Sequence, residues 1–203
     1  MARINNNDAP LDFSCSCGQL HGHIAPEAAE SGLHLVCYCR DCRAAELYFK
    51  QPDPAPGPVD LFQITPDSIT VTAGAQNLGL FRLSPRGTMR WYATCCDTPL
   101  FNTTPSAKFP FAGIRVATMA EPDRIGPVVS KAFAPRPGGK SKHEGISRMA
   151  WGVITRMLAA RLSGRWRQTP FFDIETGKPV ANPTIPSKEE RAALYPDQRN
   201  ISG

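Results

Sequence analysis

The stretch VDLFQITPDSITVTAGAQNLGLFRL, residues 59–83, decides the fold class. It contains three short runs that are rich in β-branched and aromatic residues, at 59–64, 68–72 and 78–83. Pro66-Asp67 and Gly74 separate these runs and are typical turn residues. Short runs that recur about every ten residues between turns predict an antiparallel β structure.

The same rhythm continues on both sides of this stretch. Further runs of the same kind lie at 19–24, 33–38, 89–93 and 114–119. Residues 51–58 hold four prolines, which cannot donate hydrogen bonds to a sheet, so this segment is expected to be a surface loop. The sequence therefore predicts a mainly β protein, built as an antiparallel β sandwich.

A helical pattern follows the last of these runs. Apolar residues between Ile146 and Leu162 recur on one face of a helix. Ser141 and Glu144 fit a capping box and Gly164 fits a helix stop, so one long amphipathic helix is expected at about 142–163. We expect its apolar stripe to pack on the sheet rather than to anchor the chain in a membrane.

These patterns divide the chain into three parts. Residues 1–10 are polar and are expected to form a mobile lead. Residues 11–120 are expected to form the β domain. Residues 121–203 are expected to form an extension that packs on the same domain, with the long helix and a short second helix near 188–194.

Composition narrows the class of protein. Hydrophobic residues make up 41% and charged residues 20% of the chain, as in a globular protein. No apolar run approaches the roughly 18 residues of a membrane-spanning helix, and no export signal precedes the first run. We therefore expect a cytoplasmic protein, in which seven cysteines stay reduced and serve metal binding or catalysis rather than disulfides.

The net charge of +5 is unevenly placed. Residues 131–170 contain nine Lys or Arg and the single acid Glu144. Such a segment can attract nucleic acid or acidic lipids, but it is more often the solvated face of a helix. Its basic residues are not interleaved with aromatic residues and form no nucleic-acid-binding motif, so we expect neither nucleic acid nor a membrane as a partner.

The cysteines fall into close groups that suit zinc, which prefers four thiolate or imidazole ligands in a tetrahedron. Two sites can be drawn. The first is a closed structural site in which Cys15 and Cys17 meet Cys96, with Cys95 as a possible fourth ligand, so that the N-terminal hairpin is joined to the strand that ends near Ala93. The second has three thiolates within six residues, from Cys37, Cys39 and Cys42, and three protein ligands with one open position are the pattern of a catalytic zinc.

The sequence leaves other arrangements of these cysteines open. The second site could instead be closed by a fourth protein ligand, for which His21, His23 and His34 are candidates. Cys95 and Cys96 could form a disulfide between adjacent residues rather than bind a metal.

The cysteine spacing and order resemble those of the glutathione-dependent formaldehyde-activating enzymes, a family of small zinc-bound, tent-like β proteins. The likeness spans roughly residues 13–119 and rests on four motifs: Ser14-Cys15-Ser16-Cys17-Gly18, Cys37-Tyr38-Cys39-Arg40-Asp41-Cys42-Arg43, Gly74 with Leu78-Gly79-Leu80-Phe81, and Trp91 through Leu100. The resemblance implies a structural zinc held by the first and last groups and a labile catalytic zinc at Cys37, Cys39 and Cys42. The family's closing C-x-x-C-G motif has Ala93 and Asp97 here at its first and last positions.

The resemblance also implies an activity, the carbon–sulfur lyase reaction in which a thiol such as glutathione adds to formaldehyde or a related small electrophile. Arg40 and Arg43 flank the three cysteines and are candidates for binding the carboxylates of such a thiol. Asp41 is a candidate proton carrier. The alternative is a non-catalytic zinc module whose basic C-terminal helix engages a partner or nucleic acid.

Overall fold

The computed structural model describes residues 9–195, so the lead expected at 1–10 lies outside the described residues except for its last two. Twelve strands are present in this range: β1 Leu11–Ser14, β2 His21–Ile24, β3 Leu33–Cys37, β4 Val59–Ile64, β5 Ile69–Ala73, β6 Leu78–Phe81, β7 Met89–Ala93, β8 Thr98–Thr103, β9 Ala112–Arg115, β10 Ser130–Pro135, β11 Ser141–Glu144 and β12 Pro183–Thr184. The helices are α1 Pro26–Ser31, α2 Arg40–Tyr48, α3 Ile146–Leu162 and α4 Lys188–Ala193. The predicted mainly β fold is confirmed.

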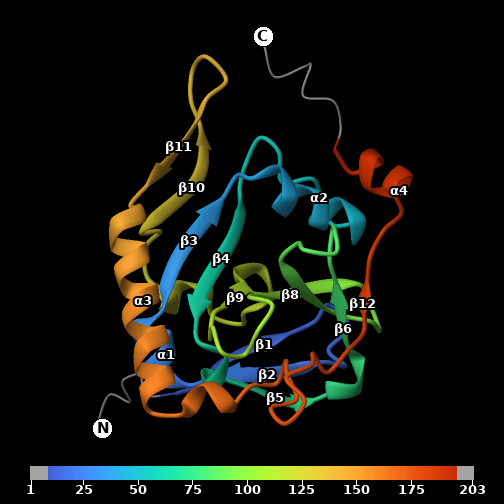
Figure 1. The fold of residues 1–203 in the computed structure, drawn as a ribbon. Helices are drawn as coiled ribbons and strands as arrows, with labels where there is room; N and C mark the ends of the chain where they lie inside the picture. Colours follow the sequence, from blue (N-terminus) through green and yellow to red (C-terminus); the bar gives the residue numbers. More distant parts are fainter. Residues whose placement is uncertain (1–8, 196–203) are drawn as a thin grey trace, which may run out of the picture.

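The strands form two sheets (Figure 1). One is three-stranded, in the order β1-β2-β5, and the other is nine-stranded, in the order β11-β10-β3-β4-β9-β8-β7-β6-β12. Neighbouring strands are antiparallel, apart from the parallel pairs β10 with β3 and β6 with β12. Both parallel pairs are made by the C-terminal part of the chain, which adds strands to a sheet that the earlier residues have built.

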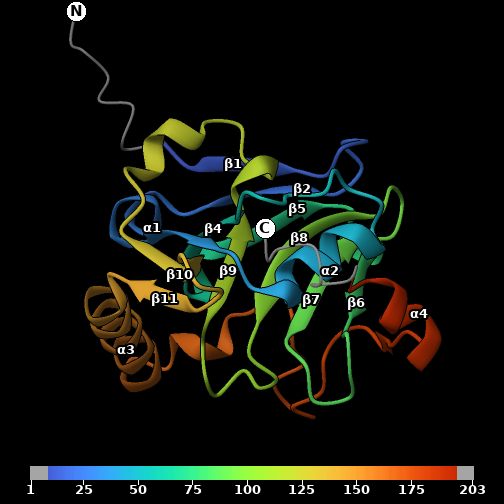
Figure 2. The same ribbon diagram turned by 90° about the horizontal axis from the view of Figure 1, so that it is seen from above.

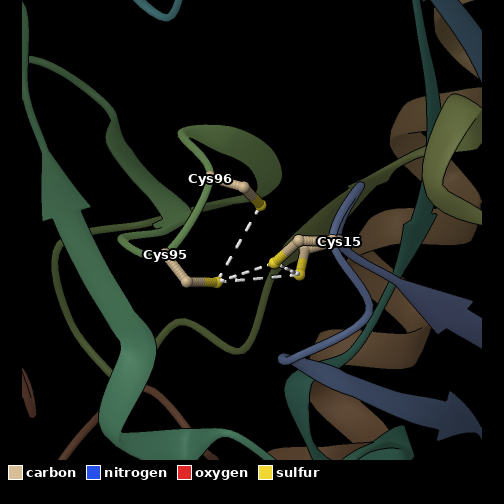
Figure 3. Close-up of side chains that lie close together, drawn as sticks. Cys15, Cys95 and Cys96 are labelled. Carbon is tan, nitrogen blue, oxygen red and sulfur yellow. Dashed lines mark hydrogen bonds between the residues drawn. The ribbon is translucent and has the colours of Figure 1, made fainter.

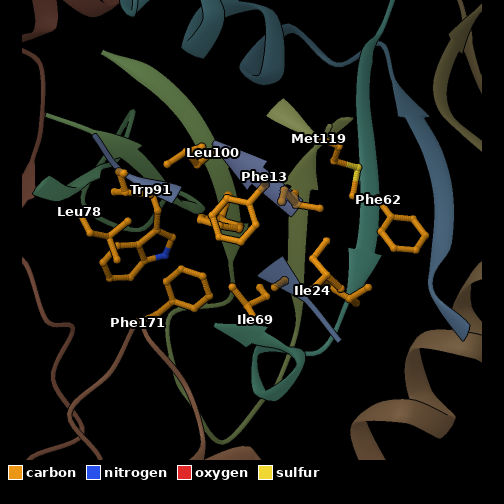
Figure 4. Packing of buried hydrophobic residues seen from close by; sticks show 14 of the residues in the cluster. Phe13, Ile24, Phe62, Ile69, Leu78, Trp91, Leu100, Met119 and Phe171 are labelled. Atoms are coloured by element: carbon orange, nitrogen blue, oxygen red, sulfur yellow. The ribbon is translucent and has the colours of Figure 1, made fainter. Parts of the chain in front are cut away.

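The main hydrophobic core lies between the two sheets (Figure 4). The three-stranded sheet contributes Phe13 and Ile24, and the nine-stranded sheet contributes Trp91, whose indole N–H donates to Thr103 Oγ1 at 2.9 Å. Phe171, which follows α3, packs with its ring centroid 5.0 Å from that of Trp91. The C-terminal extension therefore supplies part of the same core.

Helix α3 lies near one edge of the nine-stranded sheet, whereas α2 packs on strands inside it, with Glu46 paired to Arg115 of β9. In Figures 1 and 2, α3 runs beside β10 and β11, while α2 and α4 lie toward the other end of the nine-stranded sheet. The short helix expected near 188–194 is present as α4. Its capping box joins Ser187 and Glu190 through reciprocal hydrogen bonds. None of the helices described in residues 9–195 is long and apolar enough to cross a membrane.

The expected start of the long helix was wrong. Ser141 and Glu144 do not cap a helix but belong to β11, where they pair with Pro135 and Lys131 of β10. The chain turns into α3 at Gly145, whose φ is +66° and where an added Cβ would lie 2.1 Å from the carbonyl oxygen of Val129. The pairing of β10 with β11 in a hairpin therefore overrides the capping-box pattern of the sequence. Only glycine fits the connection between β11 and α3.

The expectation that the apolar stripe of this helix packs on the sheet was met only in part. Met149 packs against a small buried group that includes Leu35 of β3. Ile146, Ile154, Leu158 and Leu162 are instead exposed, and so is Trp151. The helix presents two apolar faces, and the sheet covers one of them.

Candidate metal centres

Four cysteines from two turns converge on one point (Figure 3). Cys15 and Cys17 come from the turn between β1 and β2, and Cys95 and Cys96 come from the turn between β7 and β8. The Sγ atoms of Cys15 and Cys17 lie 3.6 Å apart, and Cys95 Sγ lies 3.9 Å from Cys15 Sγ and 3.3 Å from Cys17 Sγ. We call Cys15, Cys17, Cys95 and Cys96 the four-cysteine cluster.

The four-cysteine cluster has the dimensions of a closed zinc site. All four sulfur atoms lie within 4.8 Å of one another. Zn–S bonds of about 2.3 Å in a tetrahedron place the sulfurs about 3.8 Å apart, so the observed separations need little adjustment. Cys95 and Cys96 are not joined, because their sulfurs lie 3.9 Å apart, and all seven cysteines are free.

Hydrogen bonds prepare this cluster for negative charge. The backbone N–H of Leu20 donates to Cys15 Sγ at 3.3 Å. Burial disfavours the charged form of Cys96, but hydrogen bonds with Ser16 and Thr98 outweigh it and lower the pKa of Cys96 to about 5. A thiolate, rather than a thiol, is the form that binds a metal.

The two departures from the family's closing motif have structural explanations. Ala93 is fully buried in the main core, and Cys95, two residues later in the turn, takes part in the cluster. Asp97 stands where the family has glycine and has a φ of +54°, in the left-handed region that glycine favours. Aspartate tolerates this conformation better than most residues.

Substitution of Asp97 therefore tests the geometry of this turn. We expect Asp97→Val to lower the free energy of unfolding by about 1–2 kcal/mol, because a β-branched residue is strained at positive φ. Asp97→Gly should stay within about 0.5 kcal/mol of wild type. Denaturant unfolding of both variants measures the difference, and equal stability of the valine and glycine variants would show that the turn is not left-handed at this residue.

Three further cysteines meet where β3 joins α2. Cys37 ends β3, Cys39 is the N-cap of α2, and Cys42 lies in its first turn. The Sγ of Cys39 accepts a hydrogen bond from the backbone N–H of Cys42 at 3.3 Å. All three sulfurs lie within 4.8 Å of one another, and we call them the cysteine triplet.

Charge within the cysteine triplet concentrates on Cys39. Hydrogen bonds from Cys37 and then from Cys42 lower the pKa of Cys39 to about 3, against the opposing effect of burial. The same hydrogen bond with Cys39 raises the pKa of Cys37. For Cys42, contact with Cys37 works to lower the pKa, but contact with Cys39 and burial outweigh it and raise the pKa. The partly exposed Cys39 is therefore the member of the cysteine triplet whose thiolate form is most favoured.

No histidine completes the cysteine triplet. Within residues 9–195, no His, Cys, Asp or Glu atom other than the three thiols belongs to this group. His34 is engaged on both ring nitrogens, with Asp60 Oδ1 and the carbonyl of Gly126, each at 2.7 Å. His21 interacts with the carbonyl of Gly18 at 2.9 Å. The residues suit a metal with three protein ligands and one open position.

Two adjoining cavities of about 440 and 670 Å³ lie beside the cysteine triplet, and Cys37 and Cys39 line both of them. Arg43 lines the smaller cavity, but its guanidinium is held bidentately by Asp53, with N–O distances of 2.7 and 2.6 Å. Arg40 is exposed, with its guanidinium 5.4 Å from the ring centroid of Tyr195. Of the two arginines predicted to bind a ligand, only Arg40 is free of a bidentate ion pair.

Sequence reasoning missed a third arginine. Arg90 of β7 is 7% exposed, donates to Asn102 Oδ1 at 3.3 Å, and has a buried Nε without a partner among the described residues. It lines the larger cavity together with Cys39 and Cys42. The available signal was one arginine within the otherwise apolar strand Met89–Ala93.

A buried ion pair lies one helical turn beyond the cysteine triplet. Glu46 of α2 is 5% exposed, and its Oε2 accepts a hydrogen bond from Arg115 Nη2 at 2.9 Å. Burial raises the pKa of Glu46 and outweighs the opposing effect of Arg115. This pair ties α2, which carries Cys42, to β9 of the sheet.

Comparison with known proteins assigns the chain to a family whose function is unknown. The family described as "Family of unknown function (DUF6151)" matches residues 8–184. No protein with a curated description matches the chain. A crystal structure of a Rhodobacter sphaeroides protein matches with 19% sequence identity and a TM-score of 0.40, covering 58% of this chain and 96% of that chain.

Proposed function

We propose that this chain, which belongs to the DUF6151 family of unknown function, is a zinc enzyme that adds a small thiol to formaldehyde or a related small electrophile at the cysteine triplet. One observation carries the proposal: three cysteines converge on one point, no fourth described His, Cys, Asp or Glu joins them, and all three line a cavity. The four-cysteine cluster would hold a second, structural zinc.

When bound at the cysteine triplet, zinc would keep an incoming thiol deprotonated at neutral pH. The protein itself supplies the electrostatic environment of the cysteine triplet. The N-terminus of α2 and the cation of Arg90 both favour negative charge beside Cys39 and Cys42. The cavity holds the two reactants together, which lowers the entropic part of the barrier.

The reaction balances without an oxidant or reductant. The sulfur lone pair forms a bond to the carbonyl carbon, the C=O π electrons move to oxygen, and the proton lost by the thiol ends on that oxygen as a hydroxymethyl group. Asp41 remains the candidate proton carrier. It accepts a hydrogen bond from Tyr195 Oη at 2.9 Å, and Tyr195 lines the smaller cavity.

Exchange spectroscopy of formaldehyde with glutathione tests the activity, because it reports both directions of adduct formation at equilibrium. We expect the zinc-loaded protein to raise the exchange rate above the spontaneous rate. Cys39→Ser should lower the added rate by at least about 100-fold, because it removes a metal ligand. Equal exchange with and without wild-type protein would refute this substrate pair.

Arg90 gives a prediction about thiol preference. Arg90→Met should raise the KM for glutathione about 10–100-fold, since a hydrogen bond to a charged group contributes about 1.5–3 kcal/mol. The KM for the uncharged thiol 2-mercaptoethanol should change less than about threefold. Arg86→Met, at an exposed arginine, controls for net charge. Parallel losses with both thiols would show that Arg90 does not contact a carboxylate.

The non-catalytic alternative is favoured by the exposed face of α3. In that case the metals support the fold, and the basic segment 131–170 engages a partner. A gel shift with duplex DNA at two salt concentrations tests the nucleic-acid form of this alternative, because phosphate binding weakens steeply with salt. Salt-sensitive binding together with no effect on thiol exchange would favour it over the enzyme.

A further inference from the structure

The outer face of α3 carries four large apolar side chains that are exposed: Trp151 at 72%, Ile154 at 51%, Leu158 at 55% and Leu162 at 88%. We call these four residues the outer face. Their spacing of three or four residues places them in one line along the helix. Isolated exposed apolar residues are ordinary on a protein surface, but a continuous stripe on one helix indicates a surface that something covers.

The opposite side of α3 is held against the rest of the domain by packing and hydrogen bonds. The outer face is therefore fixed in its orientation toward the surroundings of the protein. Gly152 lies against the sheet, where an added Cβ would be 2.9 Å from Leu33 Cδ1. Arg156 Nη1 donates to the carbonyl of Ser31 at 2.7 Å, and its Nη2 donates to Gln63 Oε1. The helix therefore cannot roll to bury the outer face without breaking these contacts.

Two arginines flank the outer face. Arg148 and Arg161, both exposed, stand on its two sides at helical positions next to the stripe. They belong to segment 131–170, with its nine Lys or Arg and one acid. Arg161 also lies with its guanidinium 4.9 Å from the ring centroid of Trp166. An apolar line between cations is the pattern of a helix that lies in the interface of an acidic bilayer.

We propose that the outer face of α3 docks on a membrane surface that contains anionic lipids. Trp151 and the three aliphatic side chains would enter the boundary between headgroups and acyl chains, and the basic residues near the surface would be attracted to acidic lipid. This proposal departs from the expectation, made from the sequence, that the chain has no membrane partner. The proposal does not depend on the activity of the cysteine triplet.

A second copy of the chain fits the outer face less well. Stable protein interfaces bury roughly 1,200–2,000 Å² through about 20–30 residues a side, whereas the outer face offers four. Two copies would also bring two basic segments together. An acidic lipid surface matches both the narrow apolar line and the charge.

Co-sedimentation of the full-length, zinc-loaded protein with vesicles tests the proposal. We expect binding to vesicles of phosphatidylcholine mixed with phosphatidylserine, weaker binding at high salt, and little binding to phosphatidylcholine alone. Trp151 should report the event by a blue shift of tryptophan fluorescence. Absence of binding to the mixed vesicles at low salt would overturn the proposal.

Variants distinguish vesicle binding by the outer face from nonspecific hydrophobic binding. Trp151→Ser with Leu158→Ser should weaken vesicle binding at least about tenfold, because burial of one such side chain contributes about 1.5–3 kcal/mol. Phe109→Ser, at a site 60% exposed outside α3, is the matched control and should bind as wild type. An unchanged thermal transition verifies that the double variant folds. If sedimentation equilibrium instead shows a dimer that the double variant loses, a second copy covers the outer face and the proposal is wrong.

Discussion

Replacing Cys15 with serine is expected to lower the free energy of unfolding by at least about 4 kcal/mol. Metal binding to four thiolates contributes directly to folding, because the unfolded chain holds no preformed site. The four-cysteine cluster joins the turn after β1 to the turn after β7, and so links the three-stranded sheet to the nine-stranded sheet. Serine keeps the size of the side chain but is a poor zinc ligand.

The measurement is denaturant unfolding followed by the fluorescence of the buried Trp91. Ser14→Ala, at the exposed neighbour of Cys15, is the matched control and should change stability by less than about 0.5 kcal/mol. A strong chelator should destabilise the wild type to the level of Cys15→Ser and should have a much smaller effect on that variant. Equal stability of Cys15→Ser and wild type would mean that no metal supports the fold at this place.

Arg115→Met is expected to lower the free energy of unfolding by about 3–5 kcal/mol, because it leaves the buried carboxylate of Glu46 without its cation. The loss should depend on pH. Burial already raises the pKa of Glu46 in the folded protein, and removal of Arg115 takes away the main opposing effect. The folded variant then holds the proton more tightly than the unfolded chain, so its stability falls as pH rises above the pKa of Glu46 in the unfolded chain.

The double variant Arg115→Met with Glu46→Gln provides the control for this prediction. It removes the uncompensated charge, so it should recover at least half of the lost stability and should lose the pH dependence. Unfolding in urea at two pH values measures both effects. A loss in Arg115→Met that is the same at both pH values would show that Glu46 is not a buried, charged group.

The sequence predicted strands best where the apolar run and its bounding turns agreed. The runs at 59–64 and 89–93 coincide with β4 and β7, whose side chains face the main core or the small buried groups beside it. The run at 114–119 was displaced, since β9 begins earlier, at Ala112, and ends at Arg115, where the chain continues as a 3-10 turn at Val116–Thr118. Apolar residues continue through such a turn, so an apolar run does not show where the hydrogen-bonded pairing of a strand ends.

Elements that depend on distant partners could not be predicted. Helix α2 was missed because its sequence RDCRAAELY has no recognised N-cap, while in the structure the sulfur of Cys39 accepts the capping hydrogen bond. Strands β10 and β11 were missed because β10 joins the nine-stranded sheet by pairing with β3, nearly 100 residues earlier in the chain, while residues 141–144 of β11 were read as the start of a helix. No local pattern carries that information.

The candidate site also has a part that could be predicted from the sequence and a part that could not. The cysteines could be grouped from the sequence, because each candidate ligand set is made of pairs or triplets that are close in the chain. The charged residues around them could not. Arg43 forms an ion pair with Asp53. Arg90 lines the larger cavity beside the cysteine triplet from a strand some fifty residues later in the chain. Side-chain partners across a sheet follow from register, which the sequence alone does not specify.

The central claim is that the chain binds two zinc ions at two independent sites, and metal counting tests it most directly. Elemental analysis should find about two zinc ions per wild-type chain, and about one in Cys37→Ala, which loses the ion of the cysteine triplet. Cys15→Ala should retain the cysteine-triplet ion if its folded fraction is isolated. One zinc ion in the wild type, lost with Cys15→Ala and kept in Cys37→Ala, would contradict this claim, because the cysteine triplet would then hold no metal.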